Sequence, residues 1–137
     1  MRVEQGFGQS LAGAAEALIG CRFRLYGRDP ASGLDCVGVL AAALKSVGGV
    51  ADFPCDYALR MRDVVGFVAQ AEGLGFAAVV GEIARDDAVM VQVGPHQFHL
   101  AIAAGAGEFI HAHAGLRRVV KAALLPEWEM VGHWRMG

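Results

Sequence analysis

The sequence predicts an α+β domain in which N-terminal helices pack against an antiparallel β-sheet. Two observations support this class. Apolar residues recur at helical spacing in the N-terminal part of the chain, whereas the C-terminal part consists of short β-rich runs separated by turns. A length of 137 residues suits one compact domain with a proper core, so we expect a single domain over residues 1–137.

Three helices are expected in order along the chain. The first covers residues 11–19, whose apolar positions fall on one face, and Gly20 is a plausible stop. The second follows the turn-rich segment YGRDPASG: Asp35 has the chemistry of an N-cap, apolar residues repeat at helical spacing over 37–47, and Gly48-Gly49 can end the helix. A third is expected from about residue 57 to residue 71.

The strands are expected in the second half of the chain, where β-rich runs are separated by Gly, Pro or His-Gln turns. The GAG segment at 105–107 joins two of these runs at hairpin length. Consecutive short runs with such connections are typical of an antiparallel meander. The four predicted strands are AVMVQV (88–93), FHLAIAA (98–104), EFIHAH (108–113) and LRRVVKA (116–122).

Charge and composition exclude several classes of protein. A net charge of −2 gives no basic footprint for nucleic acid, and no apolar run reaches the length of a membrane span. The three cysteines, at positions 21, 36 and 55, are an odd number and form no disulfide framework. The N-terminal segment carries Glu4 and Glu16 and does not resemble a signal peptide. We therefore expect cytoplasmic synthesis with reduced thiols.

Cys36 is a candidate nucleophile because it begins the second predicted helix. A thiol in the first turn of a helix lies near the positive end of the helix dipole and near unpaired backbone N–H groups, which lower its pKa. A buried structural thiol is the alternative, since free cysteines are among the most buried residues. We prefer that alternative for Cys21 and Cys55, neither of which has a helix start and a turn around it.

His99 and His111 could serve as the base and as the partner that orients it. If their strands pair across a turn centred near Ala106, position 99 opposes a position close to 113. His111 then lies on a neighbouring or diagonal pair, within reach of cross-strand side chains. A nucleophilic thiol needs such a base, and the base needs an orienting group. The two histidines and Cys36 are therefore a candidate catalytic set.

A metal site is an alternative use of the same atoms. Four imidazoles fall within 18 positions, in a His-x-x-His pattern followed by His-x-His, and such a set could hold zinc. A pair of strands rarely directs four side chains to one point, so we favour the nucleophile and expect no metal or other cofactor. The four residues are His96, His99, His111 and His113.

Two other features have structural explanations. Trp128 and Trp134 are expected to cover the sheet or the edge of the core, and not to stack on sugars. Asp86-Asp87 is expected to form a turn before a strand, because adjacent strand residues point to opposite faces and cannot make a paired acid/base site.

The pattern as a whole resembles the NlpC/P60 cysteine peptidases, papain-like bacterial enzymes that cut cell-wall peptides. The resemblance runs through AEALIGCRFRLYGRDPASGLDCVGVL, RDDAVMVQV, FHLAIAAGAGEFIHAHAG and LRRVV, and so covers nearly the whole chain. It implies a papain-like fold in which Cys36 is the nucleophile, His99 the general base and His111 the residue that orients His99. It further implies that Asp35 helps to bind the free amine of an N-terminal L-alanine. The implied substrate is a peptidoglycan stem peptide, cut between γ-D-glutamate and the diamino acid.

Two departures from the family pattern bear on the substrate. Val37 stands where the family has serine after the cysteine, and Phe23 stands where it has a tyrosine; Tyr26 is a candidate replacement for that phenol. Compact members of the family without wall-binding repeats or export signals occur as phage or gene-transfer-particle tail proteins. The expected partners are therefore peptidoglycan peptides and, in a particle, phage-like tail proteins. The alternative function is a non-catalytic structural or adaptor component of such a tail that keeps the fold.

Overall fold

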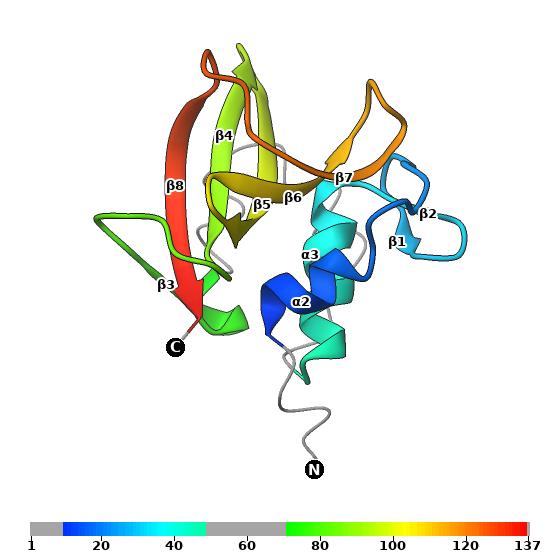
Figure 1. Cartoon of the computed structure of the whole chain (residues 1–137), viewed down its shortest axis with the longest axis horizontal. Coiled ribbons are helices and arrows are strands. Elements are labelled where there is room, and N and C mark those ends of the chain that lie inside the picture. Colours follow the sequence, from blue (N-terminus) through cyan, green and yellow to red (C-terminus); the bar gives the residue numbers. More distant parts are fainter. Residues whose placement is uncertain (1–9, 49–70, 137) are drawn as a thin grey trace.

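The computed structural model describes residues 10–48 and 71–136, and it confirms the α+β class (Figure 1). Helices α2 (Leu11–Glu16) and α3 (Cys36–Ser46) pack against each other and against one face of an antiparallel sheet. The strand order of this sheet is β3-β8-β4-β5-β6-β7. The predicted helix over residues 57–71 lies outside the described residues except at its last position.

The sheet contains the four predicted strands and two that the sequence analysis did not predict. The meander consists of β4 (Ala88–Gly94), β5 (Gln97–Gly105), β6 (Glu108–His113) and β7 (Arg118–Ala122). The start of β7 was predicted two residues too early, because the chain turns before it and Arg117 has a positive φ of 63°. The additional strands are β8 (Glu129–Met136), which pairs with β4, and β3 (Phe76–Ala78), which pairs with β8.

Helix α2 is shorter than predicted. Beyond Glu16 the backbone tightens into i→i+3 hydrogen bonds, from Leu18 to Ala15 and from Ile19 to Glu16. The chain then leaves the helix, and Gly20, with a φ of 94°, donates its N–H to the carbonyl of Val119 in β7. Ile19 is therefore exposed and lies outside the apolar face on which it was predicted.

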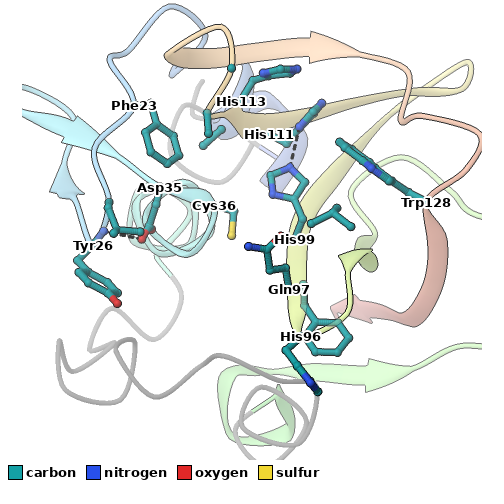
Figure 2. Close-up of a pocket in the computed structure, with 16 residues that line it drawn as sticks. Phe23, Tyr26, Asp35, Cys36, His96, Gln97, His99, His111, His113 and Trp128 are labelled. Carbon is teal, nitrogen blue, oxygen red and sulfur yellow. Dashed lines mark hydrogen bonds between the residues drawn. The ribbon is translucent and has the colours of Figure 1, made fainter.

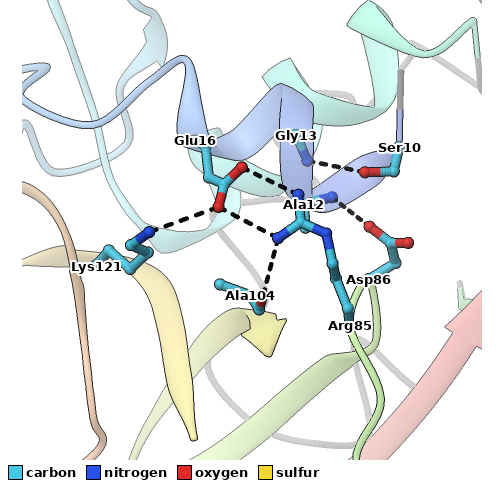
Figure 3. Close-up of polar contacts among 8 residues, drawn as sticks. All are labelled: Ser10, Ala12, Gly13, Glu16, Arg85, Asp86, Ala104 and Lys121. Carbon is cyan, nitrogen blue, oxygen red and sulfur yellow. Dashed lines mark hydrogen bonds and ion pairs between the residues drawn. The ribbon is translucent and has the colours of Figure 1, made fainter. Parts of the chain in front are cut away.

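Polar contacts fix both ends of α2 to the rest of the domain (Figure 3). At the N-terminus, the Ser10 hydroxyl accepts from the N–H of Gly13, and a carboxylate oxygen of Asp86 accepts from the N–H of Ala12 at 2.7 Å. At the C-terminal end, Glu16 pairs with Arg85 at 3.0 Å. Because these contacts connect α2 to the segment that precedes β4, they hold the helix at a fixed place over the sheet.

The core lies on both faces of the sheet. The larger cluster fills the space between the helices and the sheet, and its most buried members include Leu40, Leu44, Ile102 and Ile110. A smaller cluster on the opposite face consists of Val89, Ala101, Ala103 and Phe109. Within the described residues, no helix is long and apolar enough to cross a membrane.

A short hairpin precedes α3 and determines where that helix begins. Its strands are β1 (Arg28–Asp29) and β2 (Gly33–Leu34), and Leu34 is fully buried. The segment before the hairpin connects it to the rest of the domain. In this segment Phe23 forms a parallel β-bridge with Leu34 of β2 and donates its N–H to the carbonyl of Arg117. The start of α3 is thus placed close to the end of β6.

Candidate active site

Cys36 is the first residue of α3, as the sequence predicts. Asp35 is the N-cap: its backbone is extended and its carboxylate accepts from the N–H of Gly38 at 2.9 Å. This cap ends the β2 segment and starts the helix within a single residue. The thiol that follows points into a pocket, toward the side on which His99 lies (Figure 2).

Gly38 allows the helix start to approach the preceding loop. A Cβ atom at this position would overlap the carbonyl oxygen of Gly27, and one at Gly27 would overlap the carbonyl oxygen of Gly33. Because neither glycine has a side chain, the first turn of α3 can pack directly against the β1–β2 hairpin. Gly38, two residues after Cys36, thus has a steric role that determines where Cys36 lies.

The hairpin between β5 and β6 brings the two predicted histidines together. Ile102 pairs with Ile110 and Ala103 with Phe109, so the turn is centred at residue 106, as expected from the sequence. Across this register the Nε2 atom of His99 lies 2.8 Å from the Nδ1 atom of His111. The predicted contact between the two rings is confirmed, and the rings meet edge to face with centroids 4.9 Å apart.

This hydrogen bond decides which atom of His99 can act as a base. The Nε2 atom of His99 is bound to His111, so Nδ1 is the nitrogen left for the pocket side of the ring. For Nδ1 to accept a proton, Nε2 must carry the hydrogen and donate it to Nδ1 of His111. His111 then holds its own hydrogen on Nε2, a buried atom that has no hydrogen-bond partner among the described residues.

Burial keeps all three groups uncharged at neutral pH. It raises the pKa of the Cys36 thiol to about 11; the nearby charge of Asp35 acts in the same direction, and backbone hydrogen bonds at Leu100 and Val37 act against it. Burial, with the charges of His111 and His113, lowers the pKa of His99 to about 3. Burial and the charge of His113 lower the pKa of His111 to about 4.

The direction of the Cys36 shift corrects the expectation from the sequence. The helix start was predicted to lower the pKa of the thiol. In the folded protein, the loss of solvent around the sulfur and the negative charge of the adjacent carboxylate outweigh the helix start. Both shifts favour the uncharged forms, a neutral thiol and a neutral imidazole.

Trp128 belongs to the site, although the sequence analysis assigned it to the sheet or the core edge. Its ring meets His99 with centroids 5.7 Å apart and His111 with centroids 6.4 Å apart, both edge to face (Figure 2). No motif marks this residue, because it reaches the histidines through the long connection between β7 and β8. Trp134, by contrast, is buried in the core as predicted.

The pocket in front of Cys36 has a volume of about 550 Å³. It contains all six residues that the sequence singled out for catalysis or substrate binding. Phe23 and Tyr26 line one side, beside Asp35, and the histidine pair lines the other. Apolar side chains make up most of the remaining wall, and the further lining residues are Leu25, Val93, His96, Gln97, Phe98, Ala112, His113, Ala114, Gly115 and Trp128.

The imidazoles do not gather into the zinc site that the sequence also allowed. His99 and His111 are bound to each other, and the Nδ1 atom of His113 accepts from the N–H of Leu116 at 3.0 Å. His96 is exposed at the β4–β5 turn. In the described parts of the chain, no group of three or more His, Cys, Asp or Glu side chains is arranged to hold a metal ion.

Solved structures with the same architecture are NlpC/P60 proteins. The chain superimposes on NlpC1 from Trichomonas vaginalis with a TM-score of 0.71 at 19% identity, covering 92% of this chain and 42% of that protein. An NlpC/P60 family protein from Bacillus cereus gives a TM-score of 0.66 at 22% identity, with 93% and 39% covered. The NlpC/p60 domain of the peptidoglycan hydrolase SagA gives 0.57 at 25% identity, with 88% and 95% covered.

The chain has the papain-like NlpC/P60 fold. It spans less than half the length of the Trichomonas and Bacillus proteins but nearly all of the SagA domain. No family profile matches the sequence, and no curated protein matches it. The NlpC/P60 fold is therefore recognised through its three-dimensional arrangement and through the short motifs around Cys36, His99 and His111.

Arg28 is the second site residue that sequence reasoning missed. Its Nη1 atom lies 2.7 Å from a carboxylate oxygen of Asp35, and the N–H of Tyr26 donates to the other oxygen at 2.7 Å. Tyr26 has a positive φ of 62°, an uncommon conformation for a residue other than glycine. Arg28 precedes Asp35 by only seven residues, which makes it a candidate partner. Arg22 and Arg24 also lie shortly before Asp35, however, and no feature of the sequence distinguishes Arg28 from them.

Proposed function

We propose that the chain is a cysteine endopeptidase that hydrolyses peptidoglycan stem peptides, at the bond between γ-D-glutamate and the diamino acid. The single observation that carries the proposal is the arrangement of a helix-start thiol in a pocket beside the hydrogen-bonded pair His99–His111. The NlpC/P60 fold, which the chain shares with a domain of the peptidoglycan hydrolase SagA, supports the choice of substrate class.

The proposed reaction is acyl transfer through a thioester. The Cys36 sulfur attacks the carbonyl carbon of the scissile amide as its proton moves to Nδ1 of His99. The first turn of α3 offers backbone N–H groups without acceptors inside the helix, and these can stabilise the negative oxygen that forms. His99 then gives the proton to the leaving amine as the C–N bond breaks, and a water molecule hydrolyses the thioester.

His111 is proposed as a positioning residue. Its Nδ1 atom accepts from Nε2 of His99, which keeps Nδ1 of His99 unprotonated and fixes the plane of that ring. When His99 takes the proton from Cys36, the positive charge is partly shared through this hydrogen bond. Trp128 packs against both rings and limits their rotation and their access to water.

A second candidate function follows from the neutral state of the site. A thiol whose pKa is raised to about 11 and a histidine whose pKa is lowered to about 3 are a weak nucleophile and a weak base. Together with Phe23 and Val37, this observation supports a non-catalytic adaptor that keeps the fold. We place such an adaptor in a phage-like tail on the resemblance alone, with synthesis in the cytoplasm and incorporation into the particle.

Digestion of purified stem peptides, read by mass spectrometry, separates the two candidates. The wild-type chain is expected to cut one amide bond, and Cys36→Ala is expected to abolish the cut. Cys21→Ala is the matched control, because it removes a thiol that packs beside the core and does not line the pocket. A folded wild-type chain that cuts no stem peptide, or a Cys36→Ala variant that still cuts, would contradict the peptidase.

A further inference from the structure

Two arginines face each other where the segment before the β1–β2 hairpin pairs with β7. An isolated antiparallel β-bridge joins Arg22 in this segment to Arg118, the first residue of β7. The backbone hydrogen bonds on either side of the bridge, each 2.9 Å long, join Val119 to Cys21 and Phe23 to Arg117. The two arginines are therefore a pair without backbone hydrogen bonds between them, the arrangement in which cross-strand side chains lie closest. The Cβ atoms of such pairs are about 4.5–5.5 Å apart.

Neither guanidinium has a counter-ion among the described residues. Both Arg22 and Arg118 are exposed. The carboxylates that form ion pairs in the described part of the chain bind other basic residues; they are Glu16, Asp35 and Asp87. Like charges directly opposite each other on neighbouring strands are destabilising. An anion bound between the two side chains would therefore remove an unfavourable interaction.

Two further arginines belong to the same surface. Arg24 lies two residues after Arg22, and Arg117 directly precedes Arg118; both are exposed, and neither takes part in an ion pair within residues 10–48 and 71–136. Arg117 has a φ of 63°, a conformation that favours glycine, yet an arginine occupies the position and adds a charge. The net charge of −2 for the whole chain conceals this local concentration of positive charge. We call these four residues the arginine surface.

We propose that the arginine surface binds a phosphate group between Arg22 and Arg118. A guanidinium donates to an anion through two parallel N–H groups, so a single arginine can occupy both oxygens of a carboxylate. A phosphate has further oxygens in a tetrahedral arrangement and can accept from two arginines at once. Arg24 and Arg117 extend the positive surface beyond the pair, which suits a chain of phosphates. This inference goes beyond the proposed peptidase and does not depend on it.

The arginine surface adjoins the pocket in front of Cys36. Arg118 pairs across β6 and β7 with His113, and His113 lines the pocket. Neighbouring strands are about 4.8 Å apart, so a phosphate between Arg118 and Arg22 would lie roughly 10–15 Å from β5, the strand that carries His99. It would not touch the reacting atoms. A polymer bound there through its phosphates would lie beside the rim of the pocket.

Isothermal titration calorimetry with inorganic phosphate tests the site at pH 7 and low salt. The wild-type chain is expected to bind phosphate, and acetate should bind at least about tenfold more weakly. Arg22→Gln and Arg118→Gln should each weaken phosphate binding by at least about tenfold, because each removes charge-assisted hydrogen bonds. Arg118→Lys keeps the charge without the planar group and should recover only part of the affinity. Lys45→Gln is the control, since it removes a positive charge from an exposed side chain of α3.

Thermal unfolding separates a lost site from a lost fold. In buffer without phosphate, Arg118→Gln should have a Tm no lower than that of the wild type, because it removes the like-charge pair. Added phosphate should raise the Tm of the wild-type chain and leave the Tm of Arg118→Gln nearly unchanged. A Tm of Arg118→Gln that rises as much as that of the wild type would contradict the site.

A second probe distinguishes the source of the phosphate. If an oligomer of glycerol phosphate binds at least about tenfold more tightly than inorganic phosphate, the site takes the phosphates of a polymer. Its affinity should then fall steeply between about 50 mM and about 200 mM salt. If inorganic phosphate binds as tightly as the oligomer, the site takes a free phosphate. Either result supports a phosphate site.

Three results would overturn the inference. The wild-type chain might bind neither phosphate probe, acetate might bind as tightly as inorganic phosphate, or Arg22→Gln and Arg118→Gln might bind phosphate as well as Lys45→Gln does. The comparison of phosphate with acetate uses only the wild-type chain, so a poorly folded variant does not remove the test.

Discussion

The Nε2 atom of His99 lies 2.8 Å from the Nδ1 atom of His111, and the two residues are held on neighbouring strands by the turn at residues 105–107. The contact is diagonal across the sheet, because the register places position 99 opposite a position near 113. The geometry leaves His99 one nitrogen for chemistry, and His111, which is 2% exposed, binds the other.

Replacement of His111 should reduce turnover more than substrate binding. His111→Ala removes the acceptor for Nε2 of His99, so the ring can rotate and change tautomer. We expect kcat to fall by about 100-fold with KM changed by less than about threefold. His111→Asn retains a side-chain acceptor and should recover part of the loss. Steady-state kinetics on a stem peptide measure kcat and KM for both variants. An unchanged kcat in His111→Ala would contradict the positioning role of His111.

The raised pKa of Cys36 predicts how its alkylation depends on pH. A pKa of about 11 means that the thiolate fraction is small at pH 7 and grows about tenfold per pH unit until the pH nears 11. Iodoacetamide labelling followed by peptide mass spectrometry should therefore give a rate at Cys36 that keeps rising above pH 8. A plateau below pH 8 would show that a thiolate–imidazolium pair forms in the free enzyme, contrary to this prediction.

Gly38→Ala should destabilise the protein through a steric clash. The new Cβ would meet the backbone carbonyl of Gly27, which cannot move without shifting the β1–β2 hairpin. We expect the free energy of unfolding to fall by about 2–3 kcal/mol, measured by urea denaturation. Gly73→Ala is the matched control, since a Cβ there meets nothing within 4 Å. Equal stability of the two variants would argue against the close approach of α3 to the loop.

Asp87 should link the stability of the sheet to pH. Its carboxylate is fully buried and binds His133 at 2.6 Å and Arg135 at 2.8 Å. Burial acts to raise the pKa of Asp87, but the hydrogen bonds from Arg135, the backbone of Ala84 and His133 outweigh it, and the net shift is well downward. A carboxyl whose pKa is depressed by folding contributes stability above its unfolded value of about 4, and that stability is lost as the pH falls below it.

The variant Asp87→Asn tests this linkage. We expect it to cost about 2–3 kcal/mol of unfolding free energy at pH 7 and less at pH 3, where the wild-type carboxyl loses its advantage. Glu129→Gln removes the same charge from an exposed side chain and should have little effect at either pH. Denaturation curves at several pH values measure the difference. A constant cost from pH 7 to pH 3 would contradict the shifted pKa.

The parts of the fold that follow from local sequence were predictable. The Asp35 cap, the helix after it and the β5–β6 hairpin each depend on residues that are close together in the chain, and their positions agree with the structure to within a few residues. The contact of His99 with His111 could be predicted for the same reason, since it follows from strand periodicity and the position of one turn.

The remaining parts depend on contacts between distant segments. Strand β8 lies between β3 and β4, and no local sequence pattern predicts that pairing. The pairing of β8 with β4 is also interrupted by a register shift between Met90 and Val91. Trp128 reaches the histidines only because β8 is placed there. The thiol pKa was predicted in the wrong direction because burial is a property of the whole fold. Arg28 was overlooked because its distance from Asp35 depends on the β1–β2 turn.

The position of β8 has a consequence for how the protein is made. This strand is inserted between two partners that precede it by about 40 residues or more in the chain, so the sheet remains divided while the ribosome is still synthesising residues 129–136. Asp87 also stays without His133 and Arg135 until those residues emerge. The sheet can therefore close only after this last strand has been synthesised and has entered between β3 and β4.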